Sequence, residues 1–330
     1  MPEVALFDSD AVLAAVAPLE AVERVRQGFV EYASGAWTMP PKTYLDASPS
    51  GDFRAMPARG AGIAILKWVT SFPHNPVAGL PVVMGVICVS SDSDGQLLAL
   101  VDARSVTALR TGAVAAVAAQ ELAREDARTV GIVGCGLHGS WAARCLAAAE
   151  YGPGVCFDPS PDAAGTLAGE LGWEAGTLED ALAQDVVTCV TPGAEPVVRA
   201  ADLHAGMHLS LLGADGPGKA EAETDVFIGA VPVRGAGPRA TLAPLSLFCD
   251  EWHQASHGGE LTGAVEAGLV TREQVTELGA VLTGTAPGRP GEGAVTLFDS
   301  TGLAIQDVAI CLAVLEAHRV GAVRAARVLL

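Results

Sequence analysis

The spacing of hydrophobic residues divides the chain into an antiparallel part and an α/β part. From Asp10 to Ala33 apolar residues recur at helical intervals that Pro18 interrupts, so the segment predicts two amphipathic helices. From Trp37 to Ala103 short apolar segments are broken by proline and glycine, with a hairpin signal at residues 92–95, which predicts a mostly antiparallel sheet. Its strands are expected at residues 43–45, 63–69, 82–89 and 96–101.

After a predicted helix from about Ser105 to Arg124, strands and helices alternate. That alternation is typical of a parallel, doubly wound sheet. Its strands are expected at residues 130–133, 155–157, 186–190, 209–212, 226–228, 231–233 and 294–298. A loop rich in glycine and proline covers residues 234–244, and a last helix is expected from about Leu303 to Val328. We therefore predict an α/β protein of two domains, which a length of 330 residues permits.

A glycine-rich turn between the first strand of this sheet and the next helix indicates a dinucleotide site. Gly134, Gly136 and Gly139 have the G-x-G-x-x-G spacing, which permits a tight turn, a close approach to a pyrophosphate and close packing of the helix. Asp158 follows the second strand, at about the 20-residue separation typical of this motif. A carboxylate there accepts hydrogen bonds from the adenosine ribose and repels a 2′-phosphate, so NAD is favoured over NADP. The alternative is a glycine-rich turn in some other α/β protein.

Composition and charge argue against several partners. The chain has 20 Lys and Arg against 38 Asp and Glu, a formal net charge of -18, which argues against nucleic acid or an anionic membrane surface. The seven cysteines have no zinc spacing and the histidines form no ligand cluster, so we predict no metal. Neither a signal peptide nor an apolar run of membrane-spanning length is recognisable, and a cytoplasmic enzyme is expected.

Seven segments give the chain a specific resemblance to a known family. They are residues 39–45 (MPPKTYL), 52–58 (DFRAMPA), 66–69 (LKWV), 107–113 (TALRTGA), 213–219 (GADGPGK), 257–260 (HGGE) and 298–307 (FDSTGLAIQD). In this order they resemble the ornithine cyclodeaminase and mu-crystallin family, and more closely its archaeal-type alanine dehydrogenase branch. The resemblance implies a Rossmann NAD-binding domain, residues 118–301, inserted into an α+β substrate-binding and dimerisation domain, residues 1–117 and 302–330. It also implies a homodimer.

The resemblance assigns roles to individual residues. Lys67 matches the family's active-site lysine and Asp215 its active-site aspartate, so both are expected to be catalytic. Substrate binding is expected from Lys42, Arg54 and Arg110. Lys42 stands where many members have an arginine, so a point charge replaces the bidentate fork of a guanidinium. Cofactor contacts are expected from Thr111, Gly134, Gly136, Leu137, His138, Gly139, Asp158, Thr191, Gly213 and Ser300. Between residues 221 and 250 the chain is longer than the branch leads us to expect.

These side chains also have structural interpretations. Lys67 could extend its ammonium from a strand end to water, Arg54 and Arg110 could be ion-pair partners, and Asp215 could be a solvated turn residue. Burial of Lys67 in a mainly apolar strand would instead destabilise its ammonium and favour proton transfer near neutral pH. Glu260 is expected to start a helix, with a position facing the site as the alternative.

Oxidation of a 2-amino acid needs a cation for the carboxylate, a base, and a nicotinamide close to Cα. The leading hypothesis is an NAD-dependent dehydrogenase of the alanine dehydrogenase type, which converts a small L-amino acid to a 2-keto acid and ammonia. The rivals are an imine or ketimine reductase, an ornithine cyclodeaminase that forms proline with bound NAD, and a mu-crystallin-like binding protein without turnover. The joint presence of Lys67, Arg110 and Asp215 argues against the last.

Overall fold

A computed structural model describes residues 3–193, 195–216, 218–232 and 242–329. Two compact units make up the chain: unit 1 is Met1–Arg110 with Leu303–Leu330, and unit 2 is Thr111–Gly302. The division falls after Arg110 inside helix α3 (Ala103–Leu122), and the boundary predicted after residue 117 lies in the same helix. The predicted loop at 234–244 lies mostly outside the described residues. Within the described ranges, no helix has the length and hydropathy needed to cross a lipid bilayer.

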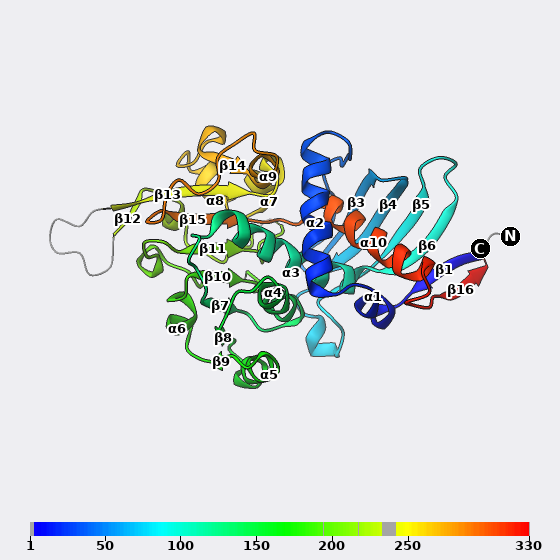
Figure 1. The fold of residues 1–330 in the computed structure, drawn as a ribbon, viewed down its shortest axis with the longest axis horizontal. Coiled ribbons are helices and arrows are strands. Elements are labelled where there is room, and N and C mark those ends of the chain that lie inside the picture. The colour runs from blue at the N-terminus through cyan, green and yellow to red at the C-terminus, as the bar shows by residue number, and fades with distance from the viewer. Residues whose placement is uncertain (1–2, 194, 217, 233–241, 330) are drawn as a thin grey trace. The chain divides into compact units, whose positions relative to one another are not determined.

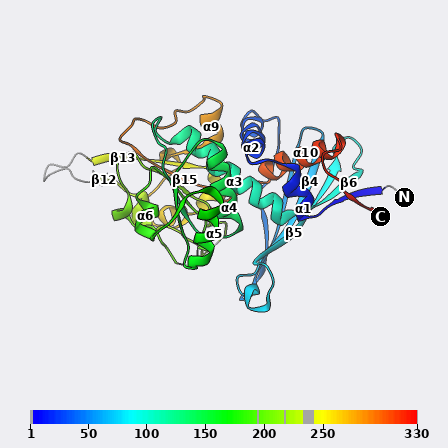
Figure 2. The same cartoon turned by 60° about the horizontal axis from the view of Figure 1, so that its bottom comes forward.

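Unit 1 is a seven-stranded sheet with helices α2 and α10 packed together against one face (Figures 1 and 2). The strand order is β16-β1-β6-β5-β4-β3-β2, in which β1 and β6 pair in parallel and the other neighbours are antiparallel. The strands are β1 (Glu3–Phe7), β2 (Thr43–Ala47), β3 (Gly51–Gly60), β4 (Ile63–Ser71), β5 (Val83–Ser91), β6 (Leu97–Asp102) and β16 (Ala326–Leu329). The helices are α1 (Ser9–Ala15), α2 (Pro18–Ala33), the start of α3, and α10 (Ala304–Arg319), with a 3₁₀ turn at Asn75–Ala78.

The helices and strands predicted for this unit are confirmed except at its end, but strands β1 and β3 were not predicted. The two expected N-terminal helices are α1 and α2, and Pro18 is the first residue of α2, where its missing N–H costs nothing. The four expected strands are β2, β4, β5 and β6. The last helix was predicted too long: it ends at Arg319, Gly321 follows at a φ of +79°, and the chain returns as β16 to pair with β1.

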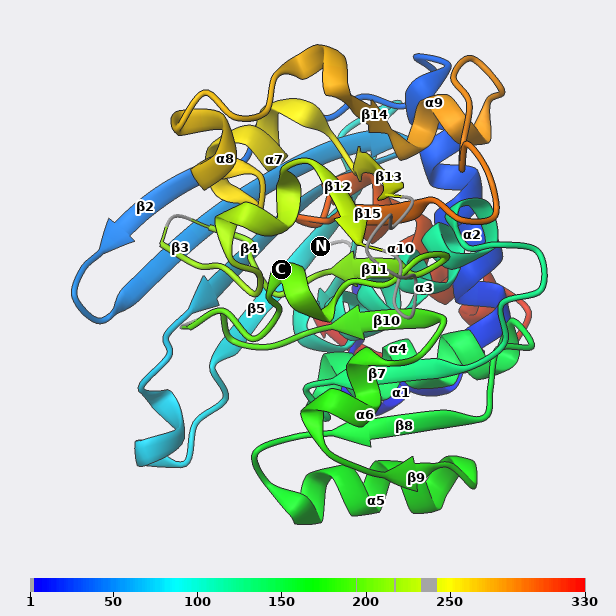
Figure 3. The ribbon, with the colours of Figure 1, turned by 90° about the vertical axis from the view of Figure 1, so that its left-hand side faces the viewer.

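Unit 2 is a sheet wound in two directions from its central strand β7 (Figure 3). The order is β12-β13-β15-β11-β10-β7-β8-β9, with β14 beside β13; β12 is antiparallel to β13 and the other pairs are parallel. The strands are β7 (Val130–Val133), β8 (Gly154–Phe157), β9 (Glu174–Ala175), β10 (Val186–Cys189), β11 (His208–Leu211), β12 (Ala230–Pro232), β13 (Leu242–Cys249), β14 (Val275–Glu277) and β15 (Val295–Asp299). Because the winding reverses between β7 and β10, ligands of such folds bind beyond the carboxyl ends of these strands.

Helices connect most of these strands, as the predicted alternation requires. They are α4 (Leu137–Ala148), α5 (Pro161–Leu171), α6 (Leu178–Leu182), α7 (Trp252–Gly258), α8 (Thr262–Glu266) and α9 (Leu278–Leu282), with 3₁₀ turns at Ala200–Asp202, Thr224–Phe227 and Arg272–Gln274. The strand predicted at 226–228 is wrong, because Thr224–Phe227 form a 3₁₀ turn. The side chains of Val226 and Phe227 are buried there. Strand β13 was not predicted, because Pro244 and the adjoining glycine-rich loop obscure its alternation.

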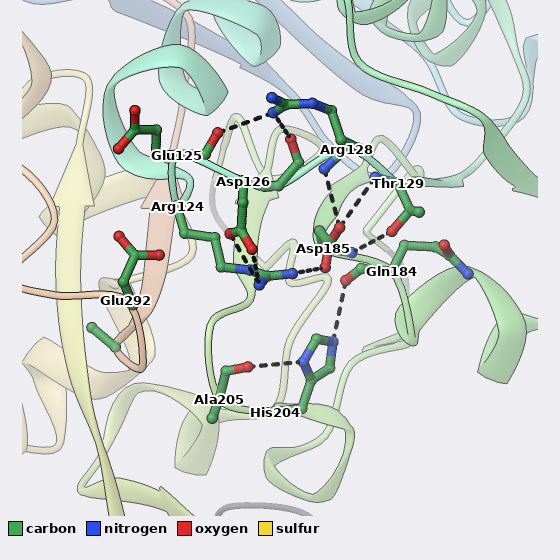
Figure 4. Close-up of polar contacts among 12 residues, drawn as sticks. Arg124, Glu125, Asp126, Arg128, Thr129, Gln184, Asp185, His204, Ala205 and Glu292 are labelled. Atoms are coloured by element: carbon green, nitrogen blue, oxygen red, sulfur yellow. Dashed lines mark hydrogen bonds and ion pairs between the residues drawn. The ribbon is translucent and has the colours of Figure 1, made fainter.

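At the amino ends of β7 and β10 a carboxylate joins the two strands (Figure 4). Asp185 Oδ2 accepts hydrogen bonds from the backbone N–H groups of Arg128 and Thr129, at 3.1 and 3.2 Å, and Asp185 also pairs with Arg124. Burial opposes ionisation of Asp185, but these hydrogen bonds and Arg124 outweigh it, so the pKa of its carboxyl is lowered. The network lies at the end of these strands opposite to the glycine-rich turn.

Candidate active site

The glycine-rich turn has the geometry that the sequence predicted. Gly134 follows β7 at a φ of +96°, in the region that favours glycine, and a Cβ there would lie 2.6 Å from the carbonyl oxygen of Val190. A Cβ at Gly139 would collide with the carbonyl oxygen of Gly134, so helix α4 packs close to the strand. Gly136 differs, since a Cβ there would meet no atom of another described residue within 4 Å. The space in front of Gly136 and the N-terminus of α4 therefore suits a phosphate.

Asp158 lies beside this turn, directly after β8. Its Oδ2 accepts a hydrogen bond from the Cys135 backbone N–H at 2.8 Å, and its Oδ1 accepts one from the Ser160 N–H at 2.8 Å. The carboxylate is thus fixed next to the glycines, where a ribose diol is bound in dinucleotide folds. Leu137 and His138 form the first turn of α4 and are half-buried.

A second buried carboxylate joins the loops that follow β10 and β11. Glu221 is fully buried, and its Oε1 accepts a hydrogen bond from the Thr191 N–H at 2.5 Å. Its Oε2 accepts from the N–H groups of Leu212 and Gly213, at 2.9 and 2.7 Å. Two residues predicted to contact the cofactor, Thr191 and Gly213, are therefore held by one side chain that the sequence analysis did not single out.

Glu260 holds the backbone of the segment that carries Glu221. Its two carboxylate oxygens accept hydrogen bonds from the backbone N–H groups of Glu221 and Ala222, at 2.6 and 3.2 Å. Burial raises the pKa of Glu221 to about 7 against the effect of its backbone donors. Burial, and next the charge of Glu221, raise the pKa of Glu260 to about 9. Both carboxyl groups therefore bind a proton more readily in the folded protein than in water, and the shift is larger for Glu260.

These shifts predict that stability decreases as the pH rises. Folded protein keeps the Glu260 proton up to about pH 9, whereas an unfolded chain releases it near 4.5, so the free energy of unfolding falls between these values. Glu260→Gln keeps a neutral group of the same size. Its melting temperature should fall less steeply between pH 5 and pH 9 than that of the unchanged protein, because the glutamine has no proton to release. Thermal denaturation of both proteins across this pH range checks the prediction. Melting temperatures that change in parallel with pH would contradict the raised pKa of Glu260.

Three further predicted residues lie in unit 2. Asp215 forms an ion pair with Lys219, whose Nζ is 2.6 Å from Asp215 Oδ1, and both side chains are partly exposed. Ser300 is buried after β15 and donates a hydrogen bond to Asp250 Oδ2 at 3.0 Å. Thr111 is buried, and its hydroxyl has no hydrogen-bond partner among the described residues. A bound ligand would satisfy that hydroxyl.

In unit 1 Lys67 forms a buried ion pair with Asp307 of α10. Its side chain lies on the helix-covered face of the sheet and is 1% exposed, with Nζ 2.8 Å from Asp307 Oδ1. Burial lowers the pKa of the Lys67 ammonium; Asp307 opposes that shift, and Arg110 adds to it. The other oxygen, Asp307 Oδ2, is buried without a hydrogen-bond partner in the described part of the chain. An interpretation of Lys67 as a strand-end lysine reaching water is therefore wrong.

Arg110 lies near this pair. Its Nη1 donates a hydrogen bond of 3.4 Å to Gln306 Oε1, the residue before Asp307. Arg110 Nε and Gln306 Nε2 are buried, and neither has a hydrogen-bond partner within the described ranges. Buried donors without partners are rare in folded proteins and often mark a site that a ligand completes. The group combines a guanidinium, an amide and an ammonium, which suits a carboxylate.

The other two predicted substrate residues differ in their surroundings. Arg54 is buried and pairs with both oxygens of Asp52, with Nε 2.6 Å from Oδ1 and Nη2 3.1 Å from Oδ2. This bidentate pairing leaves fewer of its donors for a substrate. Lys42 immediately precedes β2 and is half-buried. Substrate binding by these two residues stays a prediction.

Asp307, Gln306 and Glu221 were not predicted as parts of the site, whereas a position facing the site was the alternative for Glu260. Asp307 and Gln306 lie inside the segment 298–307 that carries the resemblance, and a buried lysine requires a carboxylate partner, so a signal was present. Glu260 is buried against the backbone of residues 221 and 222 and does not start a helix, since α8 begins at Thr262. Among the described residues, no three His, Cys, Asp or Glu side chains are placed to hold a metal ion.

Known proteins place this chain in a family. Alanine dehydrogenase of Archaeoglobus fulgidus is 37% identical over 321 residues, 95% of each chain, and iminosuccinate reductase of Paracoccus denitrificans is 31% identical over 252 residues, 74% of each. A solved archaeal alanine dehydrogenase dimer with bound NAD is 36% identical, covers 99% of both chains and superposes with a TM-score of 0.89. The family model described as ornithine cyclodeaminase/mu-crystallin matches residues 8–321. The chain belongs to the ornithine cyclodeaminase/mu-crystallin family.

Proposed function

We propose that this protein is an NAD-dependent dehydrogenase of a small L-amino acid, forming a 2-keto acid and ammonia reversibly. The observation that carries the proposal is the buried group of Lys67, Asp307 and Arg110, in which Arg110 Nε has no hydrogen-bond partner among the described residues, in a chain that also has a dinucleotide turn. The similarity to alanine dehydrogenase over 95% of the chain supports the same reaction.

NAD fits the residues of unit 2. Gly136 leaves open space before the N-terminus of α4, where backbone N–H groups and the helix dipole would bind the pyrophosphate. Asp158 would accept hydrogen bonds from the ribose, and Thr191, Gly213 and Ser300 would line the rest of the site. NAD, when bound, supplies the acceptor for the hydride that leaves the substrate Cα.

The residues of unit 1 would bind and deprotonate the substrate. Arg110 would bind the carboxylate, with Gln306 orienting its guanidinium. Lys67, whose pKa burial lowers, would take a proton from the substrate amine or from water. Asp215 would accept a hydrogen bond from the amine or orient the water that converts the iminium to the 2-keto acid.

Related reactions are distinguishable by assay. An imine reductase would oxidise NADH with a cyclic imine and need no ammonia, whereas a cyclodeaminase would convert ornithine to proline without net NADH. The dehydrogenase should oxidise NADH with a small 2-keto acid only when ammonia is present. Ammonia-independent oxidation of NADH with imines alone would instead favour the reductase, which the similarity to iminosuccinate reductase keeps as the second candidate.

The proposed ribose contact predicts cofactor preference. The unchanged protein should bind NADH more tightly than NADPH, because the Asp158 carboxylate repels a 2′-phosphate. Asp158→Ala should reduce that preference by about 10-fold or more. Fluorescence titration of both cofactors checks it. Equal or tighter NADPH binding by the unchanged protein would overturn the role of Asp158.

An apolar sheet face supports a homodimer. Leu66 and Trp68 point away from the face of β4 that holds Lys67, and with Leu45 they are 43, 38 and 58% exposed. Phe53 stacks on Trp68 with ring centroids 5.6 Å apart. Contiguous exposed apolar surface of this kind is typical of interfaces, and pairing would also protect the sheet edges. A cytoplasmic location stays a prediction.

Light scattering at micromolar concentration should give the mass of a dimer, and Leu66→Glu should give a monomer, because a charge on this face would be buried without a partner. Leu269→Glu is a matched control in unit 2, since Leu269 is also 43% exposed. Its mass should stay that of the unchanged protein. A monomeric unchanged protein would contradict the proposed dimer.

A further inference from the structure

One side chain holds the two loops at the carboxyl ends of the central strands of unit 2. We propose that Glu221 is a positioning residue for the NAD site, because its carboxylate fixes Thr191 after β10 and Gly213 after β11. This inference rests on the proposed function, since it concerns the same cofactor site. Glu221 itself would not touch NAD; it would act through the backbone of the two loops.

The contacts leave little freedom for the loops. Both oxygens of Glu221 are used, one on each loop, so the side chain works as a bridge across the neighbouring strands β10 and β11. The two loops and the side chain approach closely: a Cβ on Gly213 would lie 2.2 Å from the carbonyl oxygen of Thr191 and 2.6 Å from Glu221 Cδ. Only glycine fits at residue 213, both against the neighbouring loop and against Glu221.

The bridge is itself supported from a third element. Glu260 accepts hydrogen bonds from the N–H groups of Glu221 and Ala222, which fixes the strand-like segment that carries Glu221. Asp215 lies two residues after Gly213, so the same bridge sets where the loop with the proposed catalytic carboxylate begins. The glycine-rich turn, the Thr191 loop and the Gly213 loop all lie at the carboxyl edge, where ligands bind in doubly wound sheets.

Asp185 provides a built-in comparison. It too accepts hydrogen bonds from backbone N–H groups, those of Arg128 and Thr129 in one neighbouring segment, but at the amino ends of β7 and β10. A bridge that served stability alone would have the same consequences at either end. A bridge that positions NAD should affect binding only at the carboxyl edge.

The test compares Glu221→Gln with Asp185→Asn in the full-length protein at pH 8. A glutamine places an N–H₂ group against one of the loops, so a backbone donor there loses its acceptor. The dissociation constant and the KM for NADH should then rise by at least about 10-fold. The KM for the 2-keto acid, whose carboxylate Arg110 of unit 1 would bind, should stay within about 2-fold. Asp185→Asn should lower the melting temperature but leave NADH affinity within about 2-fold.

The outcomes separate this inference from the proposed function. If the unchanged protein binds no NADH, the proposed function is overturned. If it binds NADH and folded Glu221→Gln binds equally well, or if Asp185→Asn weakens binding as much, the positioning role is overturned.

Hydrogen exchange of the unchanged protein tests the inference without a variant that must fold. The amides of Thr191 and Gly213 should exchange slowly even without NADH, because Glu221 already holds them. Fast exchange without NADH and protection only on its addition would overturn the bridge.

Discussion

Lys67→Met should lower turnover by at least about 100-fold while NADH binding is retained. A positioned acid or base typically contributes about 10²–10⁴ in rate, and methionine keeps the volume of the side chain but cannot carry a proton. The NADH site belongs to unit 2, so its affinity should stay within about 2-fold. Steady-state kinetics, NADH titration and thermal denaturation on the same preparation measure the three quantities.

The ion pair with Asp307 adds a second effect that must be separated from the first. Lys67→Met leaves a buried, fully enclosed Asp307 carboxylate without its cation, which in other proteins costs about 3–5 kcal/mol. The double variant Lys67→Met, Asp307→Asn removes that charge and should regain most of the lost melting temperature. Its turnover should stay low. A single variant that is destabilised but fully active per folded molecule would show that the pair is structural only.

Asp215→Asn should also lower turnover by about 100-fold or more, with little effect on stability. The carboxylate pairs with Lys219 four residues away, and both side chains are partly exposed, so losing that pair should cost less than about 1 kcal/mol. The asparagine keeps the shape of the side chain but is a much weaker acceptor for an amine or for water. Turnover at saturating substrate and NAD, together with the melting temperature, checks this.

Asp225 offers a matched control for this variant. It is an exposed aspartate in a 3₁₀ turn of the same unit, and no role in the reaction is proposed for it. Asp225→Asn should keep both turnover and melting temperature. If Asp215→Asn behaves like Asp225→Asn, the aspartate at 215 is a turn residue and the proposed role is wrong.

Much of the fold could be predicted from local pattern. The run Val130–Val133 followed by three spaced glycines can form a buried strand and a tight turn, and the structure has that strand as β7 and that turn before α4. The last helix was predicted too long because apolar residues continue past Gly321, and periodicity does not reveal that β16 finds a pairing partner in β1. The structure of those residues is therefore set by the pairing of two strands that are far apart in the sequence.

The site was predictable in its residue types and less so in their partners. A lysine within an apolar strand indicated burial, and Lys67 is buried. Its partner Asp307 is 240 residues away in the sequence, and no local rule connects the two. Glu221 was missed for the same reason. Its proposed positioning role depends on three backbone hydrogen bonds, and their donors come together only in the folded loops.

In the proposed reaction, hydride leaves the Cα of a small L-amino acid for NAD. The most direct measurement is transfer of deuterium: the protein is incubated with NAD and 2-deuterated L-alanine or another small L-amino acid, and the nicotinamide is examined by NMR. We expect deuterium at C4 of NADH, with the 2-keto acid and ammonia formed in equal amounts. Unlabelled cofactor with every small L-amino acid tested, from a protein that binds NAD, would contradict the claim.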